Sequence, residues 1–104
     1  MTVIVCFCTC PSLDVATSLA RGIVADGLVA CANVIPQVIS IYRWQGEMCE
    51  EQEALLLMKT TRERYAALET ALKDRHPYEL LELIAVPVDM GLPQYLEWVA
   101  TCTA

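Results

Sequence analysis

The sequence is poor in basic residues. Seven lysines and arginines stand against thirteen aspartates and glutamates, so the formal net charge is −6. A nucleic-acid-binding surface needs cations that displace phosphate counterions, and docking on an anionic membrane needs a cluster of them. The chain contains no run of lysine and arginine. We therefore expect no nucleic-acid partner and no membrane partner.

Long apolar runs and an export signal are also missing. No stretch reaches the roughly eighteen apolar residues that span a bilayer. The N-terminus has no basic region, and its apolar run soon meets Pro11 and Asp14, which is not typical of a signal peptide. Six cysteines without an export signal indicate reduced thiols rather than disulfides. We expect a cytoplasmic protein.

Motifs for covalent catalysis are absent as well. The sequence has no glycine-rich phosphate loop, no Gly-x-Ser-x-Gly and no His-Glu-x-x-His. A Cys–His nucleophile pair is formally available from Cys8 or Cys10 with His76, but no segment supplies an oxyanion hole. An acylphosphatase needs an arginine in the loop after its first strand, and Cys10-Pro11-Ser12 has none. We expect no enzyme.

Apolar residues are abundant. They make up 56% of the 104 residues, which is enough to fill the core of a single domain spanning residues 1–104. The surplus suggests that some apolar side chains face a partner subunit.

The first half of the chain predicts a strand, a helix and a hairpin. Residues 2–9 are almost continuously apolar and predict a strand covered on both faces. Apolar residues at helical spacing follow and predict a helix. Pro11 or Ser12 can begin this helix, and Gly27 can end it. Residues 38–44 alternate as a strand does, residues 45–47 predict a turn, and residues 53–59 return as a second strand. Pro36 predicts a bulge or break.

The second half predicts two helices and a strand. Thr60 and Glu63 have the spacing of a capping box, so we expect a helix to begin there. His76-Pro77 should end it, because proline disfavours helical geometry in the preceding residue. Residues 81–88 predict a fourth strand, and Pro93 opens a short last helix.

The element order is therefore β-α-β-β-α-β with a terminal helix. With right-handed crossovers this order predicts an α+β, ferredoxin-like fold, an antiparallel sheet with helices on one face and a short C-terminal helix. Many unrelated functions use that architecture, so it names none.

Three cysteines share one strand face. Cys6, Cys8 and Cys10 are spaced by two, so neighbours lie roughly 6.6 Å apart along the strand. Thiolates on one metal ion lie within about 4 Å of each other, so all three cannot bind one ion unless the strand breaks. Each of these cysteines can be interpreted either as a small core residue or as a metal ligand. Cys8 and Cys10 lie nearer the end of the strand, where ligands commonly enter.

His76, the single histidine, also has two interpretations. It can cap a helix C-terminus, or it can bind a metal ion together with a thiolate from another segment. The acidic segment 47–51 is interpreted as a solvated turn, with a weak cation site that includes Cys49 as the alternative.

Five ordered segments together resemble a known family, the divalent-cation tolerance proteins of the CutA family. The segments cover nearly the whole chain, and they are Cys8-Thr9-Cys10-Pro11, Leu28-Val29-Ala30-Cys31-Ala32-Asn33, Ser40-Ile41-Tyr42-Arg43-Trp44-Gln45-Gly46, Leu57-Met58-Lys59-Thr60-Thr61 and His76-Pro77-Tyr78-Glu79.

The resemblance implies a cytoplasmic homotrimer whose hairpin strands pair across subunits. It also implies tolerance of divalent metals and binding of Cu(II) or another divalent cation. Carried over residue by residue, the metal ligands are Cys8 and His76, with Cys10 or Glu79 completing the set. Some members have a second histidine where this chain has Arg75, a cation that would repel a metal ion.

A second implication is a signalling protein similar to the trimeric PII type. Clefts between its subunits would bind a small metabolite or a partner protein, with Arg43, Lys59 and Arg75 as anion contacts. Trp44 and Tyr78 would either line such a cleft or anchor the trimer interface.

Overall fold

A four-stranded antiparallel sheet forms the centre of the computed structural model, which describes residues 2–104. The strands are β1 (Val3–Cys10), β2 (Cys31–Trp44), β3 (Glu47–Thr61) and β4 (Ile84–Pro87), in the order β2-β3-β1-β4. The helices are α1 (Leu13–Ala25), α2 (Tyr65–Arg75) and α3 (Pro93–Cys102), with a single 3-10 turn, η1 (Arg62–Arg64), before α2. The α+β ferredoxin-like prediction is confirmed.

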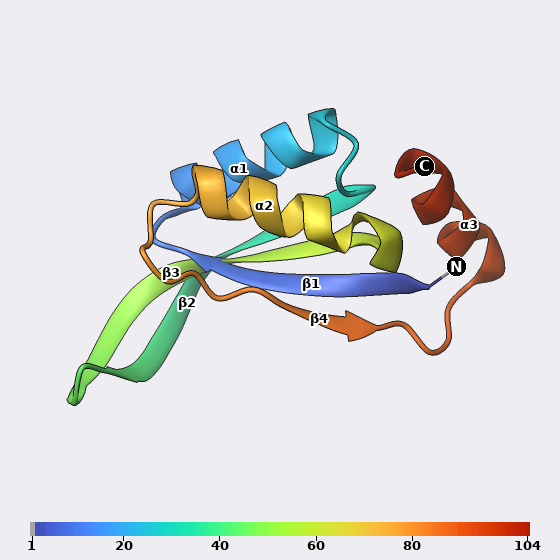
Figure 1. The fold of residues 1–104 in the computed structure, drawn as a ribbon. Coiled ribbons are helices and arrows are strands. Elements are labelled where there is room, and N and C mark those ends of the chain that lie inside the picture. The colour runs from blue at the N-terminus through green and yellow to red at the C-terminus, as the bar shows by residue number, and fades with distance from the viewer. Residues whose placement is uncertain (1) are drawn as a thin grey trace.

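The helices α1 and α2 lie side by side on one face of the sheet, and α3 lies at the end where β1 begins (Figure 1). Side chains at even positions of β1 point to the helices and are buried, whereas those at odd positions from Val5 onward are only half-buried. The prediction that this strand is covered on both faces is therefore wrong for the single chain. The open face carries apolar residues of three strands, Val5, Phe7, Leu55, Leu57, Ile84 and Val86.

Local signals at α1 are confirmed. Ser12 is its N-cap, and its hydroxyl accepts a hydrogen bond from the N–H of Val15. Gly27 follows the helix with φ of 71°, a conformation that glycine adopts without strain. One side of the helix buries Leu19 and Ile23 against the sheet.

The β2–β3 hairpin is longer than predicted. Its two strands have 14 and 15 residues, and its outer part extends beyond the body of the molecule (Figure 1). The turn is the pair Gln45-Gly46, both with positive φ, so the acidic segment 47–51 belongs to β3 and not to a turn. The bulge predicted at Pro36 is confirmed, because the register shifts between Ile35 and Val38.

The prediction that Thr60 begins a helix through a capping box is wrong. Thr60 is still in β3, and its hydroxyl donates to the carbonyl oxygen of Leu28 at 2.7 Å instead of capping a helix. Sheet pairing with β1 continues to Thr61, so the helical segment starts at Arg62. The end of α2 is as predicted, since it stops at Arg75 and His76 is extended.

The fourth strand is shorter than predicted. Only Ile84–Pro87 pairs with β1, whereas residues 81–83 are irregular. Pro93 occupies the first turn of α3, as predicted. No helix among residues 2–104 has the length and apolarity that a membrane crossing requires.

Candidate metal centre

Three of the four predicted ligands come together at one end of the sheet. The Sγ atoms of Cys8 and Cys10 and a ring nitrogen of His76 all lie within 4.8 Å of one another. Among residues 2–104, this is the only group of three or more His, Cys, Asp or Glu side chains that meets so closely. All three side chains are buried. Cys6 lies on the same strand face but is not part of the group.

Two segments far apart in the sequence build the group. β1 carries the two thiols, and the end of α2 places His76 beside the C-terminal end of that strand. Because Pro77 stops the helix, the His76 backbone turns to an extended conformation with ψ of 138°. The ring is then fixed from both sides: Nε2 lies 2.8 Å from the carbonyl oxygen of Thr9, and Nδ1 accepts from the N–H of Tyr78 at 3.1 Å.

These hydrogen bonds select the neutral tautomer of His76 that carries its proton on Nε2. A carbonyl oxygen can only accept, so Nε2 must donate to Thr9. The amide of Tyr78 can only donate, so Nδ1 carries the lone pair. Neutral imidazole is the form that binds metal ions, but an ion at either nitrogen must replace one of the two hydrogen bonds.

The two thiols interact with each other. The pKa of Cys8 is raised, first by its hydrogen bond with Cys10, then by burial, and further by the negative charges of Cys10, Glu82 and Glu53. The same hydrogen bond lowers the pKa of Cys10. Burial alone raises the pKa of Cys6 to about 11, as expected for an inert core thiol.

The arrangement fits a metal ion of borderline or soft character. Two metal–sulfur bonds near 2.3 Å in a tetrahedral shell hold their sulfur atoms about 3.8 Å apart, so the two sulfur atoms, which lie within 4.8 Å of each other, need to approach by at most about 1 Å. Sulfur and imidazole ligands suit copper and zinc better than magnesium or calcium.

The fourth predicted ligand, Glu79, lies outside this group. It is exposed in the irregular segment after Pro77 and lines a cavity of about 720 Å³ beside the hairpin. Arg75 does not face the group as a free charge, because its guanidinium forms an ion pair with Asp26 at 2.6 Å. That pairing weakens the repulsion expected from a cation next to His76.

Sequence reasoning missed Glu53 and its contact with Tyr78. Glu53 is buried on β3, and its Oε2 accepts a hydrogen bond from the Tyr78 hydroxyl at 2.5 Å. Burial raises the pKa of Tyr78, and the Glu53 carboxylate raises it further. A carboxylate directly before the apolar run that begins at Ala54 was the available signal.

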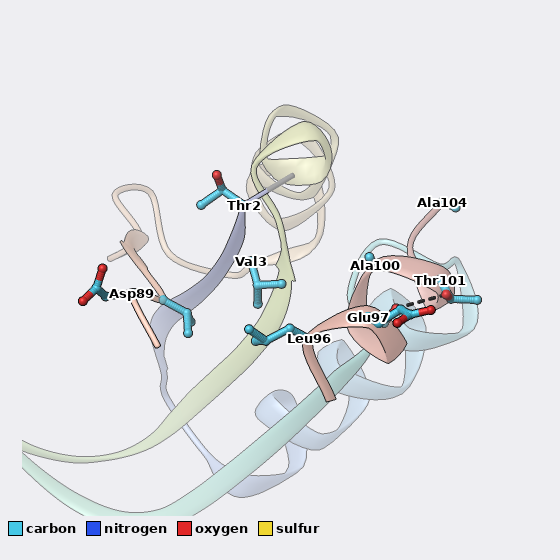
Figure 2. Close-up of a pocket in the computed structure, with 9 residues that line it drawn as sticks. Thr2, Val3, Asp89, Leu96, Glu97, Ala100, Thr101 and Ala104 are labelled. Atoms are coloured by element: carbon cyan, nitrogen blue, oxygen red, sulfur yellow. Dashed lines mark hydrogen bonds between the residues drawn. The ribbon is translucent and has the colours of Figure 1, made fainter. Parts of the chain in front are cut away.

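A second cavity, of about 600 Å³, lies between the start of β1 and α3 (Figure 2). Its lining contains no cysteine and no histidine, and the residues around it are Thr2, Val3, Val88, Asp89, Leu96, Glu97, Ala100, Thr101 and Ala104. It has none of the chemistry of the thiol group.

Comparison with known proteins identifies the family. The family model described as CutA1 divalent ion tolerance protein matches residues 4–102. The chain belongs to that family. The family is named for tolerance of divalent ions and not for a reaction.

Individual relatives agree in sequence and fold. Protein CutA homolog of Xenopus laevis is 46% identical over 93 residues, which are 89% of this chain and 62% of that protein. The chain thus spans less than two thirds of that relative's length. The structure of the divalent cation tolerance protein Cut A1 from Thermus thermophilus superimposes with a TM-score of 0.96 at 42% identity, covering 98% of this chain and 99% of the other.

The fold is also that of a PII-like protein. The structure described as PII-like protein CutA from Nostoc sp. PCC 7120 in apo form matches with a TM-score of 0.90 at 34% identity. That match covers 100% of this chain and 98% of the Nostoc chain.

Proposed function

We propose that this chain forms a cytoplasmic homotrimer that binds divalent metal ions, copper foremost, and contributes to metal tolerance. Cys8, Cys10 and His76 are the ligands. The observation that carries the proposal is the approach of their three ligand atoms to within 4.8 Å in a buried position. Glu79 is exposed and lies outside the group of three, so its carboxylate joins the set only if its segment moves toward the thiols.

The trimer is supported by the surface that the single chain leaves open. The face of the sheet opposite α1 and α2 is apolar, and the hairpin carries exposed isoleucines at positions 39 and 41 with relative exposures of 58% and 64%. Exposed apolar faces and long, uncovered edge strands promote aggregation unless a partner covers them. Copies of the same chain, packed through the hairpins, would cover both.

The metal proposal is tested by titrating copper into reduced protein and into three variants of one strand. Cys6, Cys8 and Cys10 are all fully buried on the same face, so Cys6→Ala is a matched control for Cys8→Ala and Cys10→Ala. We expect at least tenfold weaker binding in the latter two and in His76→Ala, because each loses a ligand. Equal affinity in the Cys6 and Cys8 variants would remove Cys8 from the site.

Binding should also release protons. The thiols must ionise to become ligands, so copper binding in weakly buffered solution should acidify the sample. The proton count at fixed pH should fall in Cys10→Ala relative to Cys6→Ala. A count that is unchanged between these two variants would argue against a thiolate ligand at position 10.

A further inference from the structure

The hydrogen bond between the backbone N–H of Tyr78 and Nδ1 of His76 occupies the lone pair of the neutral ring. The two atoms lie 3.1 Å apart, while Nε2 donates to the carbonyl oxygen of Thr9 at 2.8 Å. A neutral imidazole has one nitrogen lone pair in the ring plane, and a metal ion binds through that pair. In the metal-free chain this lone pair is therefore already in use.

A metal ion at Nδ1 takes the place of the Tyr78 N–H directly. Nε2 then keeps its proton and its bond to Thr9, which is the usual arrangement for a histidine ligand. A metal ion at Nε2 has the same consequence by another route. The ring proton moves to Nδ1, where it faces the N–H of Tyr78, and two donors cannot bond to each other. At either nitrogen, metal binding breaks the contact between Tyr78 and the ring.

Tyr78 is held in its position by its own side chain. Its hydroxyl donates to Oε2 of Glu53 at 2.5 Å, and Glu53 is buried on β3. The phenol ring also lies against the imidazole, with the ring centroids 4.7 Å apart. Residues 77–83 belong to no helix or strand, so side-chain contacts of this kind hold the segment in place. Moving the N–H of Tyr78 away from His76 therefore strains or breaks the bond to Glu53.

These contacts do not depend on the assembly of the protein. Tyr78 contacts both His76 and Glu53 within one chain, and Cys8 and Cys10 are already fully buried in that chain. Further copies can cover the outside of the group, but their side chains cannot reach the two sulfur atoms unless the chain opens. The competition for the lone pair of His76 is therefore decided by residues of the same chain.

We propose that Tyr78 competes with the metal ion for His76 and thereby sets the affinity of the metal centre. The inference rests on the proposed function, because it needs His76 as a ligand. The bond from Tyr78 to Glu53 stabilises the metal-free form more than the metal-bound form. A ligand is bound more tightly when the competing form is made less stable, so weakening the hold on Tyr78 strengthens metal binding. Tyr78 is thus a positioning residue and not a ligand.

Copper titration of reduced Tyr78→Phe tests the proposal. Phenylalanine keeps the ring and the backbone N–H and changes no charge, but it cannot bond to Glu53. We expect copper to bind roughly threefold to tenfold more tightly than to the parent, which is the range that one hydrogen bond contributes. A role in holding the fold alone would leave the affinity unchanged or lower it, so the direction of the change separates the two roles.

Tyr65→Phe is the matched control. Tyr65 donates to Glu69 at 3.3 Å within α2 and is not part of the thiol–imidazole group. This variant also loses a phenol hydroxyl with a carboxylate partner, and its copper affinity should stay within about twofold of the parent. Unchanged or weaker copper binding in Tyr78→Phe would overturn the proposal, and equal tightening in both variants would do the same.

Hydrogen exchange at the Tyr78 amide measures the displacement directly. The amide is hydrogen-bonded in the metal-free chain, so its exchange is slowed there. We expect at least about tenfold faster exchange in the copper-saturated protein, and equally fast exchange in metal-free His76→Ala, which lacks the acceptor. The samples are quenched in acid and resolved to single residues by mass spectrometry. Full protection of Tyr78 in the copper-saturated parent would overturn the proposal.

The proposed function and this inference fail in different ways. If His76→Ala binds copper as tightly as Cys6→Ala does, His76 is not a ligand and both fail. If His76→Ala binds copper weakly while Tyr78→Phe matches the parent, the metal centre stands and only the role of Tyr78 is lost.

Discussion

The backbone N–H of Tyr78 donates to Nδ1 of His76 at 3.1 Å, and the two rings lie with their centroids 4.7 Å apart. Tyr78 thus contacts the thiol–imidazole group through its backbone and the acidic cavity through its hydroxyl. A metal ion that displaces this N–H would alter the position of Tyr78. Tyr78 therefore connects the thiol–imidazole group to the cavity beside the hairpin.

Replacing Tyr78 by phenylalanine should destabilise the protein by about 1 to 3 kcal/mol, since it removes the only side-chain hydrogen bond to the buried Glu53 carboxylate within residues 2–104. Denaturant unfolding at fixed protein concentration measures the change. Tyr65→Phe is the control, because Tyr65 contacts the exposed Glu69 at 3.3 Å within one helix and should cost less than about 0.5 kcal/mol. Equal costs would contradict the importance of the Glu53 contact.

Replacing Gln37 by glycine should stabilise the protein by up to about 1 kcal/mol. Gln37 has φ of 60° at the β2 bulge, a left-handed conformation that costs a residue with a side chain about 1 to 2 kcal/mol. The greater freedom of glycine in the unfolded chain offsets part of the gain.

Gln52→Gly is the comparison for that substitution. Gln52 pairs with Ile39 in regular strand geometry, so the same change there should destabilise by about 0.5 to 1 kcal/mol. Thermal unfolding of both variants measures the two changes in stability. A loss of stability in Gln37→Gly would show that the backbone strain at Gln37 is small.

Replacing Ile41 by aspartate should lower the mass in solution toward that of a single 11.5 kDa chain. Ile41 is 64% exposed on the hairpin, and the proposed trimer would bury it. A charge buried without a partner opposes association. Light scattering of the variant and of Ala67→Asp, on the exposed face of α2, gives the comparison. A mass equal to that of the parent would place Ile41 outside the interface.

The phenol of Tyr42 should ionise late. Its hydrogen bond with Glu51, together with partial desolvation, raises the pKa of Tyr42 from 10.0 to about 12. Because the folded chain holds this proton more tightly than the unfolded chain does, the associated stability is complete below pH 10 and is lost as the pH rises toward 12. The phenolate absorbance of the parent minus that of Tyr42→Phe reports this group, and Glu51→Gln should move its midpoint toward the ordinary value.

The sequence by itself determined the order of elements, both ends of α1, the C-terminal end of α2 and the bulge near Pro36. These features depend on local chemistry: a serine cap, a proline that stops a helix, and side-chain alternation along strands. It also indicated Cys8, Cys10 and His76 as candidates, through spacing and through the family resemblance.

Only the tertiary structure decided which candidates meet. The strand geometry of β1 separates Cys6 from the group, whereas the turn at Pro77 returns His76 to the thiols across 66 residues of chain and leaves Glu79 outside. Thr60 is part of β3, because its pairing with β1 outweighs its local preference for capping a helix. Glu53 became a buried charge because sheet pairing and Tyr78 enclosed it. Each of these outcomes depends on contacts between residues distant in sequence, which local patterns do not encode.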